Sequence, residues 1–166
     1  MPPSGLPVKE DIIANLKTAL ESISAGSSYY TTVEKVTRYN GGPMDMTEFP
    51  CIVMTPMGTD YGPLASQGTL TSSASFRVNI GLYLRSRGAS SSLGVDPDMP
   101  VTMEKFIRDA RQAIIVDRTR NNKALNTFAV SDEVFYPTQD DDPYTVANLT
   151  IEITYRTNWD NLNIAT

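Results

Sequence analysis

The sequence predicts an α+β fold: a mixed, mainly antiparallel sheet of about four to five strands, with two helices packed on one face. Two segments repeat apolar residues at the spacing of an amphipathic helix, and two others alternate apolar and polar residues like half-buried strands. The elements run helix, three strands, helix, two strands, so helices do not alternate with every strand. The 166 residues (1–166) suit a single domain, with its core at about residues 8–159.

The first element is a helix with one apolar stripe. Pro7 suits its first turn and Gly26 supplies a stop after it. Glu10 and Asp11 complement the positive charge at the helix start. The apolar stripe consists of Val8, Ile12, Leu16, Leu20 and Ile23. We expect this stripe to dock the helix on the sheet.

Three strands are expected next. Residues 30–38 are rich in Tyr, Thr and Val, residues 49–57 are apolar enough for a central strand, and residues 76–85 alternate strictly. The connections over residues 58–75 and 86–99 are rich in Gly and Ser. Each is expected to be a flexible loop or a hairpin arm, because long loops without structure are uncommon in compact domains.

The second helix and two strands complete the chain. The helix carries a second apolar stripe, and Asp98 or Thr102 is expected to cap its start. Strands are predicted over residues 128–137 and 147–155, with a turn at residues 140–143 between them. The apolar stripe consists of Met103, Phe106, Ile107, Ala110 and Ile114. One core is expected to hold Phe76, Val78, Ile80, Leu82, Leu84, Leu149, Ile151 and Ile153, covered by Ile12, Leu16, Phe106 and Ile107.

The types of residue in the chain exclude several common kinds of catalytic site. The chain has no histidine, which excludes Ser-His-Asp and Cys-His catalysis and His-ligated zinc. Cys51 is the one cysteine, so no intrachain disulfide forms, and its apolar run suits a small buried residue rather than a nucleophile. No glycine arrangement matches a phosphate-binding loop. We therefore expect no enzyme, no metal and no cofactor, and we see no signal peptide or membrane span.

The charge is acidic overall and basic in one segment. The net charge of −5 argues against a whole-surface grip on nucleic acid. Between Glu104 and Lys123, however, six cations stand against three acids. This segment has three interpretations: a solvated face, a patch that pairs with acidic residues of a neighbouring subunit, or a nucleic-acid contact. The acid triplet at residues 140–142 is in turn either a solvated turn or an ion site, although it lacks the alternation and the glycine of a calcium loop.

Several stretches together resemble the tail terminator proteins of long-tailed bacteriophages. The resemblance rests on element order and texture rather than on an invariant motif, and it covers roughly residues 8–159. The stretches are the helix Val8 to Ser24, the strand Tyr30 to Arg38, Glu48-Phe49-Pro50 leading into Cys51 to Met54, the strand end Leu82 to Arg85, and the closing strand Leu149 to Tyr155.

The resemblance implies a structural virion protein, assembled in the bacterial cytoplasm, that forms a ring, usually a hexamer. Such a ring caps the finished tail tube and joins it to the head connector, and DNA passes through its lumen without specific binding. Its partners would be further copies of itself, the tail tube protein and the connector protein. The alternative is another neck or head-completion protein, or a generic protein-binding assembly module without catalysis.

A subunit or tail interface is the expected site. Residues 58–75 form a longer segment than the resemblance implies, which either reaches a neighbouring subunit or the tail tube or is only a flexible connecting loop. The candidate interface residues are Asp60, Tyr61, Arg108, Arg111, Arg118, Arg120, Lys123, Asp140, Asp141 and Asp142.

Overall fold

The structure is a computed structural model that describes residues 7–26, 28–39, 47–64, 71–85, 98–136 and 144–158. The predicted α+β order is confirmed, with two helices and five strands in the described residues. The elements are α1 (Val8–Glu21), β1 (Lys35–Arg38), β2 (Cys51–Leu64), β3 (Thr71–Arg85), α2 (Met99–Val116), β4 (Asn126–Phe135) and β5 (Tyr144–Asn158).

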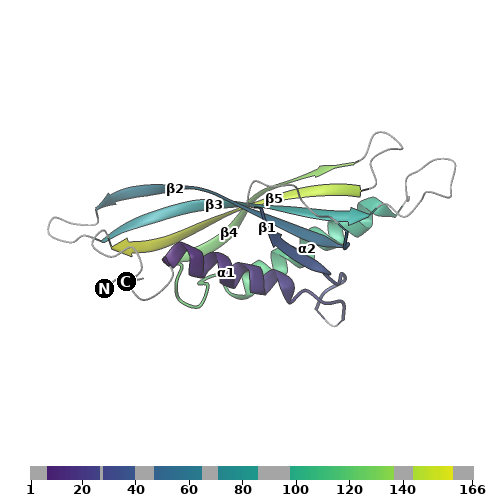
Figure 1. The fold of residues 1–166 in the computed structure, drawn as a ribbon, viewed down its shortest axis with the longest axis horizontal. Helices are drawn as coiled ribbons and strands as arrows, with labels where there is room; N and C mark the ends of the chain where they lie inside the picture. The colour runs from purple at the N-terminus through teal and green to yellow at the C-terminus, as the bar shows by residue number, and fades with distance from the viewer. Residues whose placement is uncertain are drawn as a thin grey trace.

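The strands form one mixed sheet in the order β1-β2-β3-β5-β4 (Figure 1). The pairing of β1 with β2 is parallel, and the other three pairings are antiparallel. The strand β5 therefore lies inside the sheet, between β3 and β4, although it follows both in the sequence. This arrangement leaves β4 as one edge of the sheet and β1 with the outer part of β2 as the other.

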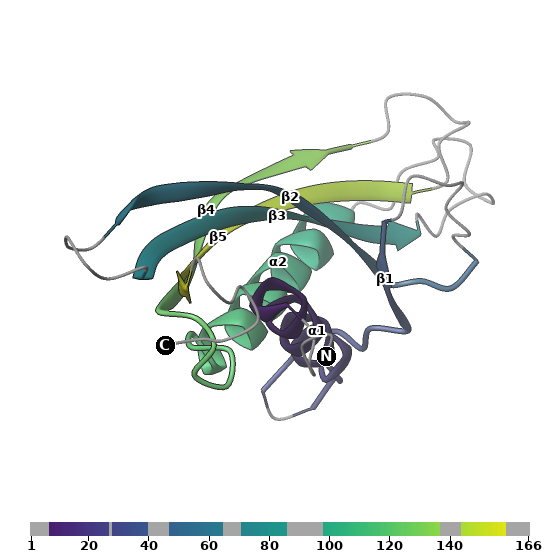
Figure 2. The same cartoon turned by 60° about the vertical axis from the view of Figure 1, so that its left-hand side comes forward.

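Both helices cover the same face of the sheet, and the core lies between them and the strands (Figures 1 and 2). The strict alternation in β3 and β5 places one set of side chains toward the helices and the other set away from them. The predicted core is confirmed: all eight strand residues and all four helix residues named above are buried. We call the other side of the sheet the open face, since no described helix covers it.

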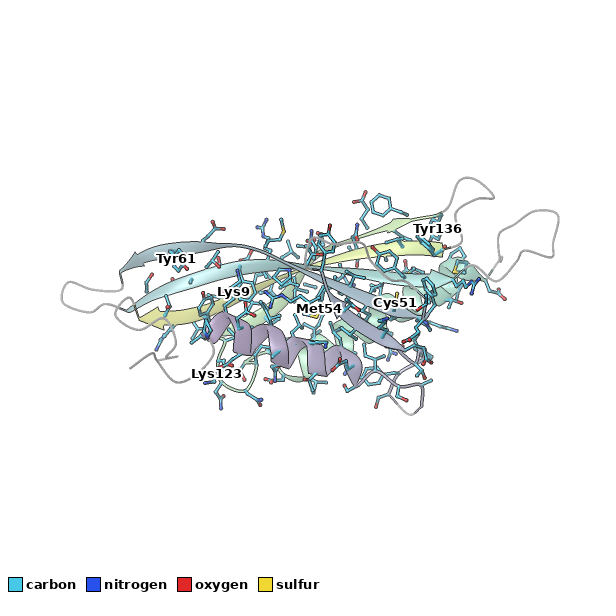
Figure 3. The ribbon with its side chains drawn as sticks, viewed as in Figure 1. Lys9, Cys51, Met54, Tyr61, Lys123 and Tyr136 are labelled. Atoms are coloured by element: carbon cyan, nitrogen blue, oxygen red, sulfur yellow. The ribbon has the colours of Figure 1, made fainter. Side chains whose placement is uncertain are left out.

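The segment predicted as a loop or hairpin arm is largely strand. Within it, residues 58–64 belong to β2 and residues 71–75 to β3, and β3 also pairs with β5 along this length. We call these two stretches the arm. The pairing of β2 with β3 shifts register between Pro56 and Thr59, where Lys9 Nζ donates hydrogen bonds to Met57 O (2.8 Å) and Thr59 Oγ1 (3.0 Å) (Figure 3). Lys9 thus ties the start of α1 to the base of the arm.

The strand predicted over residues 30–38 is shorter than expected, because β1 begins only at Lys35. The backbone N–H groups of Tyr30 and Thr31 donate to the carboxylate of Asp109 on α2 instead of to a neighbouring strand. A side chain from a distant element therefore overrides the local strand propensity of this stretch. The predicted segments at 86–97 and 140–142 lie outside the described residues.

Candidate interaction surfaces

Some cations of the predicted basic segment form ion pairs with acidic residues of the same chain. Arg111 Nη2 lies 2.6 Å from Asp132 Oδ2 of β4, and Lys123 Nζ lies 3.9 Å from Asp11 Oδ2 of α1. Arg118 is exposed and has no ion pair with any described residue. These pairs join α2 and the following turn to neighbouring elements, which favours a solvated face over a continuous basic patch.

Arg120 requires a correction, because it is fully buried and cannot belong to an exposed interface in this structure. The chain turns inward after α2 through three consecutive residues with positive φ, at positions 120–122. The guanidinium donates to the Ile114 carbonyl at the end of α2, to Thr127 Oγ1 (3.4 Å) and to Asn15 Oδ1 (3.5 Å). Burial lowers the pKa of Arg120, with Asp117 opposing that shift. Arg120 therefore satisfies a backbone carbonyl at the end of α2 and does not contribute to a subunit contact.

Asp109, one of the three acids within the predicted basic segment, is a buried carboxylate. Its Oδ2 accepts the N–H groups of Tyr30 and Thr31, both at 2.8 Å, and its Oδ1 lies 3.5 Å from Arg108 Nη1. Arg108 and Lys105 also lie over the exposed ring of Tyr30, at 4.8 and 5.4 Å. The available signal was the position of Asp109 beside Ala110 on the apolar stripe of the helix. Arg108 therefore has a structural role, because it forms an ion pair with a buried carboxylate.

Asp60 and Tyr61, the other predicted interface residues that the structure describes, do not share one face of the sheet. Asp60 pairs across the sheet with Ser75 and Tyr61 with Ala74, so the two adjacent side chains point to opposite faces. Both are exposed, and Tyr61 lies at the end of the sheet opposite Tyr136 (Figure 3). Asp140, Asp141 and Asp142 lie outside the described residues.

The open face carries an aromatic cluster at one end. The ring of Tyr144 stacks on Phe49 with centroids 6.0 Å apart and meets Tyr83 edge-on at 6.1 Å. Tyr83 folds back across Gly81, where an added Cβ would lie 2.8 Å from a ring carbon of Tyr83. Position 81 therefore needs glycine, because any larger residue would displace the aromatic ring.

Beside this cluster, the open face is hollowed into a shallow pocket of about 260 Å³. Its lining carries no charged side chain, and Asn79 is held by a 3.1 Å hydrogen bond from the hydroxyl of Thr150. Small-molecule sites usually enclose about 300–1,000 Å³, so a shallow hollow of this size suits a protein surface better than a cofactor site. The lining residues are Tyr39, Val53, Thr55, Asn79, Gly81, Tyr83 and Asn148.

Cys51 is buried, as predicted, but on the open-face side of β2 rather than against the helices. Burial raises the pKa of its thiol to about 11, with the charge of Lys35 opposing the shift. Because the thiolate is the reactive form, this cysteine is inert near neutral pH.

Exposed apolar side chains gather on the edge strand β4. Phe128, Val130 and Phe135 are 42%, 46% and 46% exposed, and we call them the β4 ridge. Phe128 and Phe135 point to the open face, because they pair with Glu152 and Val146 of β5. The register shifts at Val130, and β4 contains no proline. Clustered apolar side chains that are exposed on an edge strand often mark an interaction surface.

Other kinds of site are less well supported. In the part of the chain that the structure describes, no three His, Cys, Asp or Glu residues are grouped to hold a metal ion. No helix there is long and apolar enough to cross a membrane. Neither a scan against models of known protein families nor a search of curated protein sequences finds a match to this chain.

Proposed function

We propose that this protein is a tail terminator of a long-tailed bacteriophage: a ring-forming virion protein that caps the finished tail tube and joins it to the head connector. The observation that carries the proposal is that one sheet has two unlike edges, both with exposed apolar side chains. At one edge these are Met57, just before the arm, and Tyr61 in the arm, 48% and 51% exposed, and at the other edge they are the β4 ridge.

Two unlike surfaces are what a closed ring of identical subunits needs. In a head-to-tail contact each copy offers one surface to the copy before it and a different surface to the copy after it. A two-fold dimer would need one self-complementary patch instead. The element order on which the phage resemblance rests is also present in the fold, with two helices on one face of the sheet.

The charge supports the same role. A net charge of −5 per copy gives a ring an acidic character, which repels DNA phosphates and lets a genome slide through the lumen. The tail tube and the connector would then be recognised by the rims of the ring, and the arm is a candidate for such a contact.

Native mass spectrometry and negative-stain microscopy of the purified chain test the ring. We expect a closed ring, with six copies as the leading stoichiometry. A monomer at every concentration up to the solubility limit would overturn the proposal. A second experiment mixes the ring with isolated tail tubes and with DNA-filled heads. Binding to tube ends supports a terminator, whereas binding to heads alone would move the protein to the neck and contradict the terminator role.

A further inference from the structure

We propose that the hollow of the open face binds a proline-rich, uncharged segment, and that residues 1–6 of the same chain occupy it. These residues read Met-Pro-Pro-Ser-Gly-Leu and lie outside the described part of the chain. With Pro7, directly before α1, three of the first seven residues are proline, and none of the seven has a charged side chain. The site belongs to a single copy of the chain and does not depend on the proposed ring.

The apolar part of the hollow suits proline rings. Tyr39, Tyr83 and Val53 contribute apolar surface to its lining. The ring of Tyr83 is continued by Tyr144 and Phe49 of the aromatic cluster. Aromatic-lined grooves are the usual binding sites of polyproline segments, since such a segment is already extended before it binds and loses little entropy.

The polar groups of the lining suit the backbone of such a segment. A polyproline helix has no internal hydrogen bonds, so its carbonyl groups need donors from outside. The Thr150 hydroxyl donates to Asn79 Oδ1, which leaves the amide hydrogens of Asn79 for a ligand. The side chain of Asn148 is exposed beside it, and the hydroxyl of Tyr83 lies 3.2 Å from where a Cβ on Gly81 would be. The hollow therefore offers hydrogen-bond donors without a charge.

The neutral lining favours residues 1–6 over the other segments outside the described residues. An unpaired charge is costly to bring onto an uncharged, partly apolar surface. Residues 65–70 are neutral but contain no proline. The segments that contain at least one charged side chain are residues 40–46, 86–97, 137–143 and 159–166.

The first turn of α1 is fixed beside the edge of the sheet that borders the hollow. The guanidinium of Arg38 donates two hydrogen bonds to the carboxylate of Glu10, and Lys9 Nζ donates to the carbonyl of Met57. The residue after Arg38 lines the hollow, and so does the residue two positions before Met57. The chain that precedes α1 therefore starts close to the hollow, on the helix side of the sheet.

No described strand closes this edge. β1 pairs with β2 only from Cys51 to Met54, so from Thr55 onward β2 has no described strand on this side. Six residues of polyproline helix span about 19 Å, whereas two residues of a strand span about 7 Å. Residues 1–6 are thus long enough to pass around the edge and lie on the open face.

Peptide binding to the full chain tests the site. The probe is the peptide Met-Pro-Pro-Ser-Gly-Leu-Pro, blocked at both ends so that it carries no charge, and isothermal calorimetry measures its affinity. An N-terminal variant, Pro2→Ser with Pro3→Ser, frees the hollow of its own segment. We expect this variant to bind the peptide at least about tenfold more tightly than the wild-type chain, because a tethered segment competes at an effective concentration of about millimolar. A peptide with serine at its second and third positions should bind neither chain.

Two further substitutions, each made in the N-terminal variant, locate the binding. Asn148→Arg fills the hollow, and Ser73→Arg, at an exposed position of the open face in the arm, is the matched control. Asn148→Arg should abolish binding of the peptide, whereas Ser73→Arg should leave its affinity unchanged. Far-ultraviolet circular dichroism checks that each variant is folded, and Thr55→Arg replaces Asn148→Arg if that variant does not fold.

A disulfide then identifies the segment that occupies the hollow. Mild oxidation of a chain with Ser4→Cys and Asn148→Cys should join these positions within one chain, while Ser4→Cys with Gln112→Cys, at an exposed position of α2, should stay reduced. A disulfide formed only between chains would overturn the proposal. Equal affinity of the wild-type chain and the N-terminal variant for the peptide, no binding by that variant, or binding that survives Asn148→Arg would each overturn it as well. None of these measurements requires a ring, so their failure leaves the proposed function untouched.

Discussion

Two charged residues show where sequence reasoning reaches its limit at the level of the single residue. Arg120 and Asp109 both belong to a segment that reads as surface, yet both are fully buried. Arg120 is buried because positive-φ residues turn the chain toward the end of α2; the adjacent Asn121 and Asn122 favour such a turn, but Arg120 itself carries no sign of it. Asp109 is buried because it receives two backbone N–H groups from residues 78 and 79 positions away. A helical periodicity shows which residues share a face of the helix, but it does not show hydrogen bonds to residues so far away in the sequence.

Replacing Asp109 with alanine should therefore destabilise the fold. The N–H groups of Tyr30 and Thr31 would lose their acceptor, and each unsatisfied buried group costs about 1–3 kcal/mol. Asp109→Asn, which keeps an acceptor oxygen, should cost less. Urea unfolding measures both, with Asp132→Ala as the matched control, since that acid forms a partly exposed ion pair worth about 0–1 kcal/mol. Equal losses for Asp109→Ala and Asp132→Ala would show that the buried carboxylate has no special role.

At the level of elements, the alternating and helical segments were predictable and the edges of the sheet were not. The strict alternation of β3 and β5 fixes which side chains are buried, and the predicted core is correct in every member. By contrast, residues 128–137 read as a strand with no sign that it would be an edge, because edge position depends on the order of strands in space. The β4 ridge was missed for this reason. Nine of the ten predicted interface residues are charged, and charge alone does not show which cations a fold pairs internally.

The central strand β5 supplies a direct test of the core. Ile151 is fully buried and pairs with Val78 of β3 and Ala129 of β4, so its truncation leaves a cavity in the middle of the sheet. Ile151→Ala should lower the free energy of unfolding by about 2–5 kcal/mol. Thr154→Ala, three residues along the same strand and pointing to the open face, is the control and should change it by less than about 0.5 kcal/mol. A near-neutral Ile151→Ala would contradict the assigned core.

At the level of the whole molecule, the acidic composition argues against non-specific binding of duplex DNA. An acidic chain releases few counterions when it meets duplex DNA, so the main driving force for non-specific binding is missing. Its exposed cations are in part neutralised by acids of the same chain, as in the Arg111–Asp132 and Lys123–Asp11 pairs.

We therefore expect duplex DNA to be released rather than retained. In a gel-shift assay at about 150 mM salt, near physiological ionic strength, the protein should not shift duplex DNA at micromolar concentration. Lowering the salt should strengthen binding only slightly, because few phosphate contacts give a shallow salt dependence. Tight retention with a steep salt dependence would contradict a lumen through which the genome slides.

The interior position of β5 also sets the order in which the molecule can be built. β3 pairs with β5 through contacts such as Arg77 with Glu152, about half the chain apart, and β4 has no other strand partner among the described residues. During translation, α1, the first three strands, α2 and β4 leave the ribosome before β5 does. Until then, the side of β3 that pairs with β5 has no partner strand, and β4 has no partner strand on either side. Non-local pairing of this kind slows folding and exposes intermediates to aggregation. The folded sheet, and with it any assembly of copies, becomes available only after the whole of β5 has been synthesised.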